Sequence, residues 1–174
     1  DSSGVLNYII KQRKQGYKIF PLRGNHEQTL LNVVSNYPDH IHDYLRQFKS
    51  EDLLSLKGNI KKKYLNLLES FPHHYELDNC IFVHAALNLT DEDIFADKNF
   101  MITSRYQLGK TERLQGKTLI YGHVSMEFNI IKSNIATKQP IICIDNGCIY
   151  GDQRNGYGKL VCLNIDTFEI ITKK

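Results

Sequence analysis

Four residues combine metal-binding side chains with a shared position at the end of an apolar run. Asn25 and His26 close the first predicted strand, His84 closes another and His123 a third. In layered α/β folds, ligands collect where the ends of neighbouring strands converge. Imidazole nitrogen and amide oxygen suit divalent ions such as Mn²⁺, Fe²⁺ or Zn²⁺. The pattern therefore predicts that three histidines and one carboxamide oxygen meet at one metal site.

A single histidine at a strand end is more often a surface residue or a hydrogen-bonded residue of the core. Three histidines in the same position are harder to explain in that way. The remaining histidines lack this context, and we interpret them as ordinary surface residues: His40, His42, His73 and His74.

The elements that must position these residues are predicted to form a layered α/β fold in one domain spanning 1–174. Ser2 or Ser3 is expected to cap a first helix, which Gly16 ends. Strands are expected at 17–22, 74–77, 80–85, 118–123, 140–145, 159–166 and 168–172, with hairpins at 74–85 and 159–172. Helices are expected at 27–34 and across 38–71, with breaks near Ser50 and Gly58, and 88–117 is expected to hold loops and a short helix.

Composition narrows the functional classes. The chain has 174 residues, a net charge of +3 and a hydrophobic fraction of 41%, which is typical of a globular domain. The positive charge is too weak to indicate nucleic-acid binding, and no apolar stretch approaches the roughly 20 residues that span a bilayer. The four cysteines form no C-x-x-C pair, and Cys80, Cys143 and Cys162 lie in apolar runs where buried thiols are expected. A reducing cytoplasm is the expected compartment.

Four ordered motifs carry a resemblance to a known family: "LRGNHE" (22–27), "FVHAAL" (82–87), "YGHV" (121–124) and "IDNGCIYG" (144–151). Together they resemble the calcineurin-like metallophosphoesterases, and most closely the bacterial members of the serine/threonine phosphoprotein-phosphatase branch. The resemblance covers nearly the whole chain, and "LRGNHE" is its most specific part. It implies a metallophosphatase-type β-sandwich flanked by helices.

The resemblance also implies roles for individual residues. Asn25, His84 and His123 would bind the second of two metal ions, and His26 would protonate the leaving oxygen as the general acid. Arg23 would grip the phosphate, a task suited to its planar, permanently charged guanidinium. A hydroxide shared by the two metals would attack phosphorus in line. Mn²⁺ is the expected metal, with Fe or Zn as alternatives.

The chain departs from the family pattern most clearly in what it lacks. The Asp-x-His and Gly-Asp-x-x-Asp-Arg-Gly segments, which would supply the first metal's ligands and the bridging carboxylate, are absent. Asp1–Gly4 resembles the stretch that follows the second of them. We therefore expect a domain without its first two strands, at most one metal ion in this chain and little activity from the chain alone. Ala86, Val124 and Asn146 replace common family residues at positions outside the metal shell.

The leading functional hypothesis is hydrolysis of phosphate monoesters, with phosphoserine or phosphothreonine on proteins as substrate. A symmetrical dinucleoside tetraphosphatase fits the same motifs, so the expected partner is a phosphorylated protein or a nucleotide, with neither nucleic acid nor a membrane involved. A catalytically dead binding module of the same fold is a further alternative. A mononuclear zinc protein built on His84 and His123 would leave "LRGNHE" without an explanation.

Overall fold

The computed structural model describes residues 1–173, and its contacts divide the chain into two compact units, Asp1–Pro72 and His73–Lys174. The first unit is helical and the second contains the strands. Each unit has its own buried apolar cluster or clusters. The protein is therefore a mixed α/β molecule, as expected.

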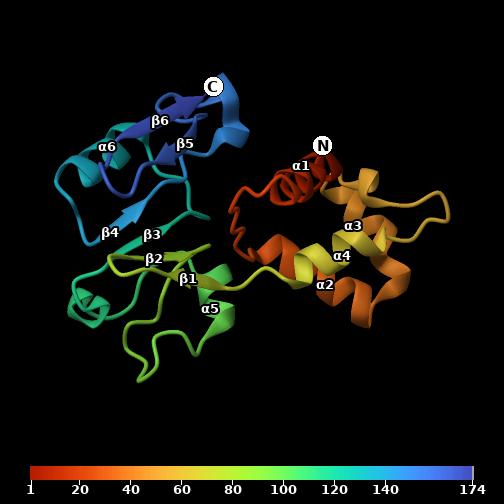
Figure 1. The fold of residues 1–174 in the computed structure, drawn as a ribbon, viewed down its shortest axis with the longest axis horizontal. Coiled ribbons are helices and arrows are strands. Elements are labelled where there is room, and N and C mark those ends of the chain that lie inside the picture. Colours follow the sequence, from red (N-terminus) through yellow and green to blue (C-terminus); the bar gives the residue numbers. More distant parts are fainter. Residues whose placement is uncertain (174) are drawn as a thin grey trace. The chain divides into compact units, whose positions relative to one another are not determined.

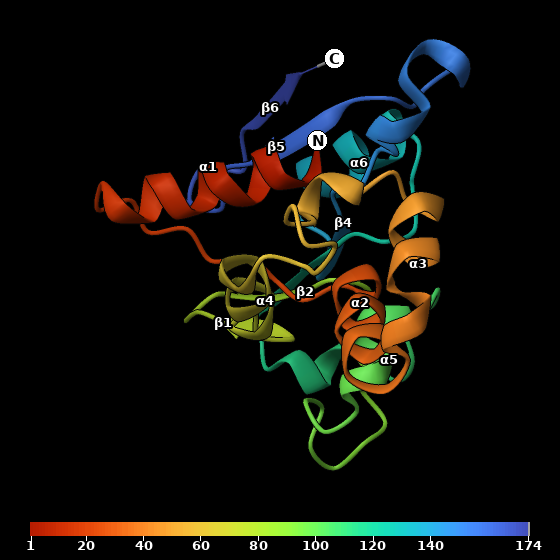
Figure 2. The ribbon, with the colours of Figure 1, turned by 90° about the vertical axis from the view of Figure 1, so that its right-hand side faces the viewer.

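The first unit contains four α-helices: α1 (Ser2–Lys14), α2 (Asn25–Asn36), α3 (Ile41–Gln47) and α4 (Lys62–Glu69). Figure 2 shows them in red to yellow. Short 3-10 turns at Pro38–His40 and Glu51–Leu53 precede and follow α3. Because α3 ends at Gln47 and α4 begins at Lys62, the expected breaks near Ser50 and Gly58 are confirmed. Each helix contributes at least one side chain to a single apolar core, and the segments between the helices contribute others. The core consists of Leu6, Leu30, Leu45, Leu53, Ile60, Tyr64, Leu67, Leu68 and Phe71.

Two expectations for the first unit are wrong. Residues 17–22 belong to neither sheet, and Tyr17 and Phe20 are each more than half exposed. An apolar run becomes a strand only where a neighbouring strand satisfies its backbone groups, and this segment has no strand neighbour among the described residues. The cap of α1 is Asp1 rather than Ser2 or Ser3, because the Asp1 carboxylate accepts a hydrogen bond from the Gly4 backbone nitrogen at 2.8 Å. Gly16 follows the end of this helix with a φ of +92°, as expected.

The second unit is built on a four-stranded sheet of order β1-β2-β3-β4 (Figure 1). Its strands are β1 (His74–Glu76), β2 (Cys80–Val83), β3 (Thr118–Tyr121) and β4 (Ile141–Cys143). β1 and β2 form the expected antiparallel hairpin, whereas β2, β3 and β4 run parallel. The parallel arrangement places the carboxyl ends of three strands along one edge.

The two faces of this sheet are covered by different elements. Ile81 and Leu119 point to a core shared with α5 (Lys98–Thr103) and the 3-10 turn Thr111–Leu114. Ile142 points to the other face and packs with α6 (Phe128–Ala136) and the antiparallel hairpin of β5 (Leu160–Leu163) and β6 (Ile170–Lys173). The unit is therefore layered, with the period-two alternation of the strands separating its two cores.

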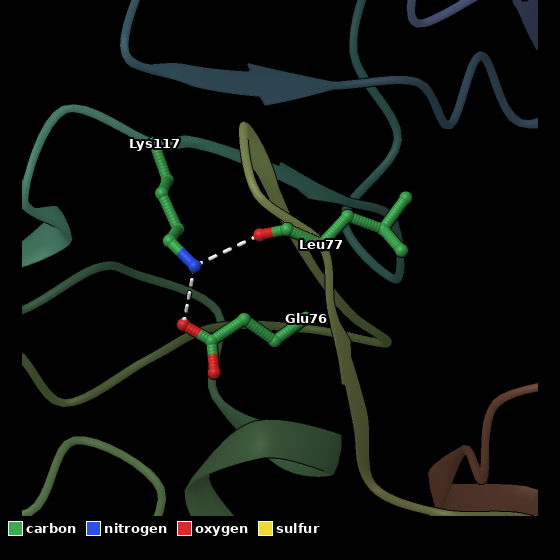
Figure 3. Close-up of polar contacts among 3 residues, drawn as sticks. All are labelled: Glu76, Leu77 and Lys117. Carbon is green, nitrogen blue, oxygen red and sulfur yellow. Dashed lines mark hydrogen bonds and ion pairs between the residues drawn. The ribbon is translucent and has the colours of Figure 1, made fainter.

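A polar contact ties the start of β3 to the hairpin. Lys117 donates to the Glu76 carboxylate and to the Leu77 carbonyl oxygen, each at 2.8 Å (Figure 3). The backbone nitrogen of Thr118 also donates to the Asn79 carbonyl oxygen at 2.9 Å. These bonds align β3 with the β1–β2 turn and so help to fix the register on which the strand ends depend.

Two further details differ from the sequence-based expectations. Cys80 and Cys143 are buried as expected, but Cys162 is exposed, because β5 buries Val161 and turns the neighbouring positions outward. Helix α6 has no counterpart among the expected elements. Within 1–173, no helix has both the length and the apolar character that crossing a membrane requires.

Candidate functional site

His84 and His123 meet at the carboxyl edge of the parallel strands. His84 directly follows β2, and His123 lies two residues beyond β3. His84 Nε2 lies 3.1 Å from His123 Nδ1, and the ring centroids are 4.9 Å apart. Both side chains are half-buried. The strand-end pattern thus correctly placed these two histidines side by side.

The backbone around the pair is tightly constrained. The Gly122 nitrogen donates to the His84 carbonyl oxygen at 3.0 Å, so β2 and β3 remain bonded beyond their last paired residues. His123 has a φ of +68°, in the left-handed region that costs a residue with a Cβ atom about 1 kcal/mol. This conformation turns the chain just after the strand, and it is the kind of local strain that clusters at functional sites.

Asp145 occupies the equivalent position after β4. Its Oδ1 accepts hydrogen bonds from the Gly147 nitrogen at 2.7 Å and from Ser125 Oγ at 3.4 Å. A Cβ atom built on Gly122 would lie 3.8 Å from Asp145 Oδ2, so the carboxylate sits beside the residue that precedes His123. Asp145 lies in the motif 144–151 and was not among the predicted site residues, although it follows an apolar strand just as the histidines do.

Asn146 holds together the loops that leave β3 and β4. It is the buried polar residue of this region, with 1% of its surface exposed. Its Nδ2 donates to the carbonyl oxygens of Met126 and Gly156, both at 2.9 Å, and its Oδ1 accepts from the Lys159 nitrogen at 3.0 Å. One side chain therefore satisfies three backbone groups, one in the loop after β3 and two in the loop after β4.

Asn25 and His26 lie in the first unit and stand at a helix start, which corrects the expectation that they close a strand. They are the first two residues of α2, and Gly24 is its N-cap. The Glu27 carboxylate accepts from the Gly24 nitrogen at 2.9 Å, which satisfies one of the free donors at this helix end. The Gly-Asn-His-Glu run is therefore a helix-capping sequence as well as a candidate site.

Arg23 is bound to the end of another helix. Its Nη2 donates to the Leu68 and Glu69 carbonyl oxygens of α4, at 3.0 and 2.6 Å, and its Nη1 donates to Gln28 Oε1 at 3.1 Å. Its buried Nε has no partner among the described residues. A cation at a helix carboxyl end is electrostatically favourable. To bind a phosphate, the guanidinium would have to give up some of these bonds.

His26 lies at the rim of a mostly apolar cavity of about 410 Å³ inside the first unit. Its ring is exposed and meets the Phe48 ring edge-on, with the centroids 4.7 Å apart. Tyr44 also lines the cavity and donates from its hydroxyl to the His26 carbonyl oxygen at 3.0 Å. Burial, reinforced by the negative charge of Glu27, raises the pKa of Tyr44 to about 12, so this hydroxyl stays protonated as a donor.

The structure thus brings together two of the predicted site residues, His84 and His123. Arg23, Asn25 and His26 are neighbours on and before α2 in the other unit. Among residues 1–173, no three His, Cys, Asp or Glu side chains gather closely enough to hold a metal ion. The metal centre therefore stays a prediction.

Comparison with known proteins does not extend these observations, since no family model, no curated protein and no solved structure matches the chain significantly.

Proposed function

We propose that this chain carries part of the active site of a metal-dependent phosphoesterase, in which His84 and His123 bind a divalent ion. The observation that supports the proposal best is the separation of their facing nitrogens, 3.1 Å. Two nitrogens each about 2.1 Å from one ion, at tetrahedral or octahedral angles, lie about 3.0–3.4 Å apart. The pair therefore has the spacing of two ligands of a single metal.

The chemistry of the surrounding groups fits the same proposal. Asp145 adds a negative charge beside the strand ends, which would offset the charge of a cation held by two neutral imidazoles. Both histidines are half-buried rather than fully buried, which is consistent with access for a substrate. Asn25 is proposed as a further ligand on the strength of the "LRGNHE" motif alone.

The proposed roles divide between the ion and the protein. A bound divalent ion would act as a Lewis acid toward a phosphate oxygen. His26 would donate a proton to the leaving oxygen, a role proposed on the strength of the "LRGNHE" motif, and its exposed ring is open to proton exchange with solvent. Arg23 would bind the phosphate once its guanidinium exchanges α4 carbonyl oxygens for phosphate oxygens.

The preferred substrate is a phosphate monoester, phosphoserine or phosphothreonine on a protein. The alternative, symmetrical cleavage of a dinucleoside tetraphosphate, predicts release of nucleoside diphosphates instead of inorganic phosphate. Assays with a phosphopeptide and with diadenosine tetraphosphate separate the two. A binding module of the same fold would bind the ligand and turn over neither substrate.

The metal assignment predicts about one Mn²⁺ per chain at saturation, bound through the two histidines. We expect His84→Ala and His123→Ala each to abolish binding in equilibrium dialysis, because one imidazole alone is a weak site. His40→Ala, which removes an exposed histidine of the first unit, should bind like the original chain.

Unchanged Mn²⁺ binding in both site variants would overturn the metal assignment. The histidines would then be a hydrogen-bonded pair that joins two strand ends. Binding of two ions would contradict the expectation of at most one and would require further ligands in this chain.

A further inference from the structure

A second cleft lies in the second unit, between the start of α6 and the loop that follows β4. It has a volume of about 410 Å³, and three cationic side chains line it: Lys132, Arg154 and Lys159. The rings of Phe128 and Tyr157 form part of its wall. Neither the four sequence motifs nor the proposed metal chemistry uses these five residues.

The three cations are held against the two aromatic rings. Lys159 Nζ lies 3.9 Å from the centroid of the Phe128 ring, and Lys132 Nζ lies 5.2 Å from the same centroid. The Arg154 guanidinium carbon lies 3.9 Å from the centroid of Tyr157. Such contacts orient the cations without neutralising them.

Hydrogen bonds between the two loops position the backbone of the cleft. The Phe128 nitrogen donates to the Gly156 carbonyl oxygen at 2.9 Å, and the same oxygen accepts from Asn146. Gly156 has a φ of +79°, and a Cβ atom there would come within 2.7 Å of Glu127 Cγ, so a larger residue would be strained and would displace the Glu127 side chain. The loops that leave β3 and β4 are thus joined at the rim of the cleft.

This concentration of charge calls for a ligand with several negative charges in a small volume. Asp152 is the carboxylate that lines the cleft, and Glu127 lies beside its rim, so a single carboxylate ligand gains little. Carboxylates along a peptide are spread over more than one residue, whereas a phosphate chain concentrates its charges on adjacent groups. Arg matches phosphate oxygens with its planar fork, and Lys supplies point charges.

We propose that this cleft binds the phosphate chain of an oligophosphate, either free or as part of a nucleotide. The loops that form it leave the same ends of β3 and β4 that carry His123 and Asp145. As a substrate subsite, the cleft rests on the proposed phosphoesterase function. It would favour the nucleotide alternative over a phosphopeptide, because the additional phosphates would be held outside the reacting one.

The test is titration of the full chain with sodium tripolyphosphate by isothermal calorimetry, after chelator treatment has removed metal. We expect Arg154→Gln and Lys159→Gln each to weaken binding about two- to fivefold, and the triple variant with Lys132→Gln to weaken it at least tenfold. Lys138→Gln is the matched control, because Lys138 also lies over a ring, 5.6 Å from Phe168, but outside the cleft. Its affinity should be unchanged.

Titration with ATP identifies the source of the phosphate chain. Tighter binding of ATP than of tripolyphosphate supports a nucleotide, and equal binding supports the phosphate chain alone. Equal affinity for pentaglutamate would overturn the proposal in favour of an acidic peptide. Wild-type affinity in the triple variant, or loss of binding in His84→Ala, would also overturn it, since the anion would then bind elsewhere.

Two different measurements test the phosphate-binding cleft and the proposed phosphoesterase function. The tripolyphosphate titration needs no metal, whereas the Mn²⁺ measurement needs no anion. A chain that bound tripolyphosphate in the cleft but no Mn²⁺ at the histidines would contradict the proposed function and support the ligand class of the cleft.

Discussion

The Cys143 thiol lies directly beneath the strand end that carries Asp145. Its Sγ donates to the Val124 carbonyl oxygen at 3.4 Å and accepts from the Asp145 nitrogen at 3.4 Å, and the residue is fully buried. Burial raises the pKa of Cys143 to about 11, with the Asp145 backbone N–H opposing the shift and the Asp145 charge reinforcing it. The neutral thiol is therefore part of the support under the candidate site.

This shift predicts a specific pH dependence of stability. Because the pKa of Cys143 is higher in the folded chain than its ordinary value of 9.0, the folded state holds this proton more tightly. The stabilisation is fully present below pH 9 and is lost as the pH rises toward 11. We expect the free energy of unfolding to fall by about 2 kcal/mol over this range from this group alone.

Urea denaturation at pH 8 and pH 10.5 measures the loss. Cys143→Ala should be less stable at both values but should lose less between them, since Tyr and Lys titration is common to both chains. An equal loss in the variant and the original chain would show that Cys143 does not titrate in this window.

At the same scale, the sequence predicted that two candidate residues lie together but did not predict their backbone conformation or hydrogen bonds. The position of His84 and His123 after apolar runs was sufficient to place them together, because parallel strands align their carboxyl ends. The left-handed backbone of His123 could not be predicted, since it depends on bonds between loops distant in sequence. The hydrogen bonds from Arg23 to α4 could not be predicted either, because the acceptors lie about 45 residues away in the sequence.

At the scale of elements, the loops after β3 and β4 are joined by backbone hydrogen bonds and by one buried side chain. Asn146 bonds Met126, Gly156 and Lys159, and it is buried from water. Backbone bonds from Met126 to Asp145 and from Phe128 to Gly156 join the same loops. The positions of the histidine edge and the cationic cleft therefore depend in part on an amide in a loop.

Removing that amide should be costly. Asn146→Ala removes the partner of the Met126 carbonyl oxygen and of the Lys159 N–H, each worth about 1–3 kcal/mol, so we expect a loss of about 3 kcal/mol in the free energy of unfolding. Asn129→Ala is the control: it removes an exposed amide that donates to Glu127 at 3.1 Å, and it should change stability by less than about 0.5 kcal/mol.

Thermal unfolding followed by circular dichroism provides the measurement, and hydrogen exchange at 146–159 reports the local effect. A loss below 1 kcal/mol in Asn146→Ala would mean that water replaces the amide readily and that the loops are not held by it.

The elements that could be predicted are those with local signals. Hairpins β1–β2 and β5–β6 combine apolar runs with polar turns, and both were predicted. The run 17–22 looked the same locally, but pairing is decided by distant segments. Helix α6 was not predicted because its isoleucines at 130, 131 and 135 favour strands in isolation, and only packing on Ile142 reveals its helical face.

At the scale of the whole molecule, the candidate residues divide between the two units. Arg23, Asn25 and His26 belong to Asp1–Pro72, whereas His84 and His123 belong to His73–Lys174. The second unit contains both sheets, two apolar clusters and the cationic cleft. It therefore has the components of an independently folding domain.

We expect residues 73–174, expressed alone, to fold cooperatively and to bind tripolyphosphate as the full chain does. Its Mn²⁺ affinity should be lower than that of the full chain if Asn25 is a ligand, and Asn25→Ala in the full chain should then reproduce the lower value. Circular dichroism and the two titrations check these outcomes. A disordered fragment would show that the second unit needs the first for folding.

The left-handed backbone at His123 also affects which substitutions evolution would favour at this position. A glycine or asparagine at this position would relax the chain and raise stability, but it would remove the imidazole that faces His84. Random substitution would therefore gain stability here at the expense of the proposed site, and under the proposed function selection for the imidazole keeps a histidine in place. In related sequences, glycine or asparagine at this position would mark a lineage that has lost the proposed chemistry and kept the fold.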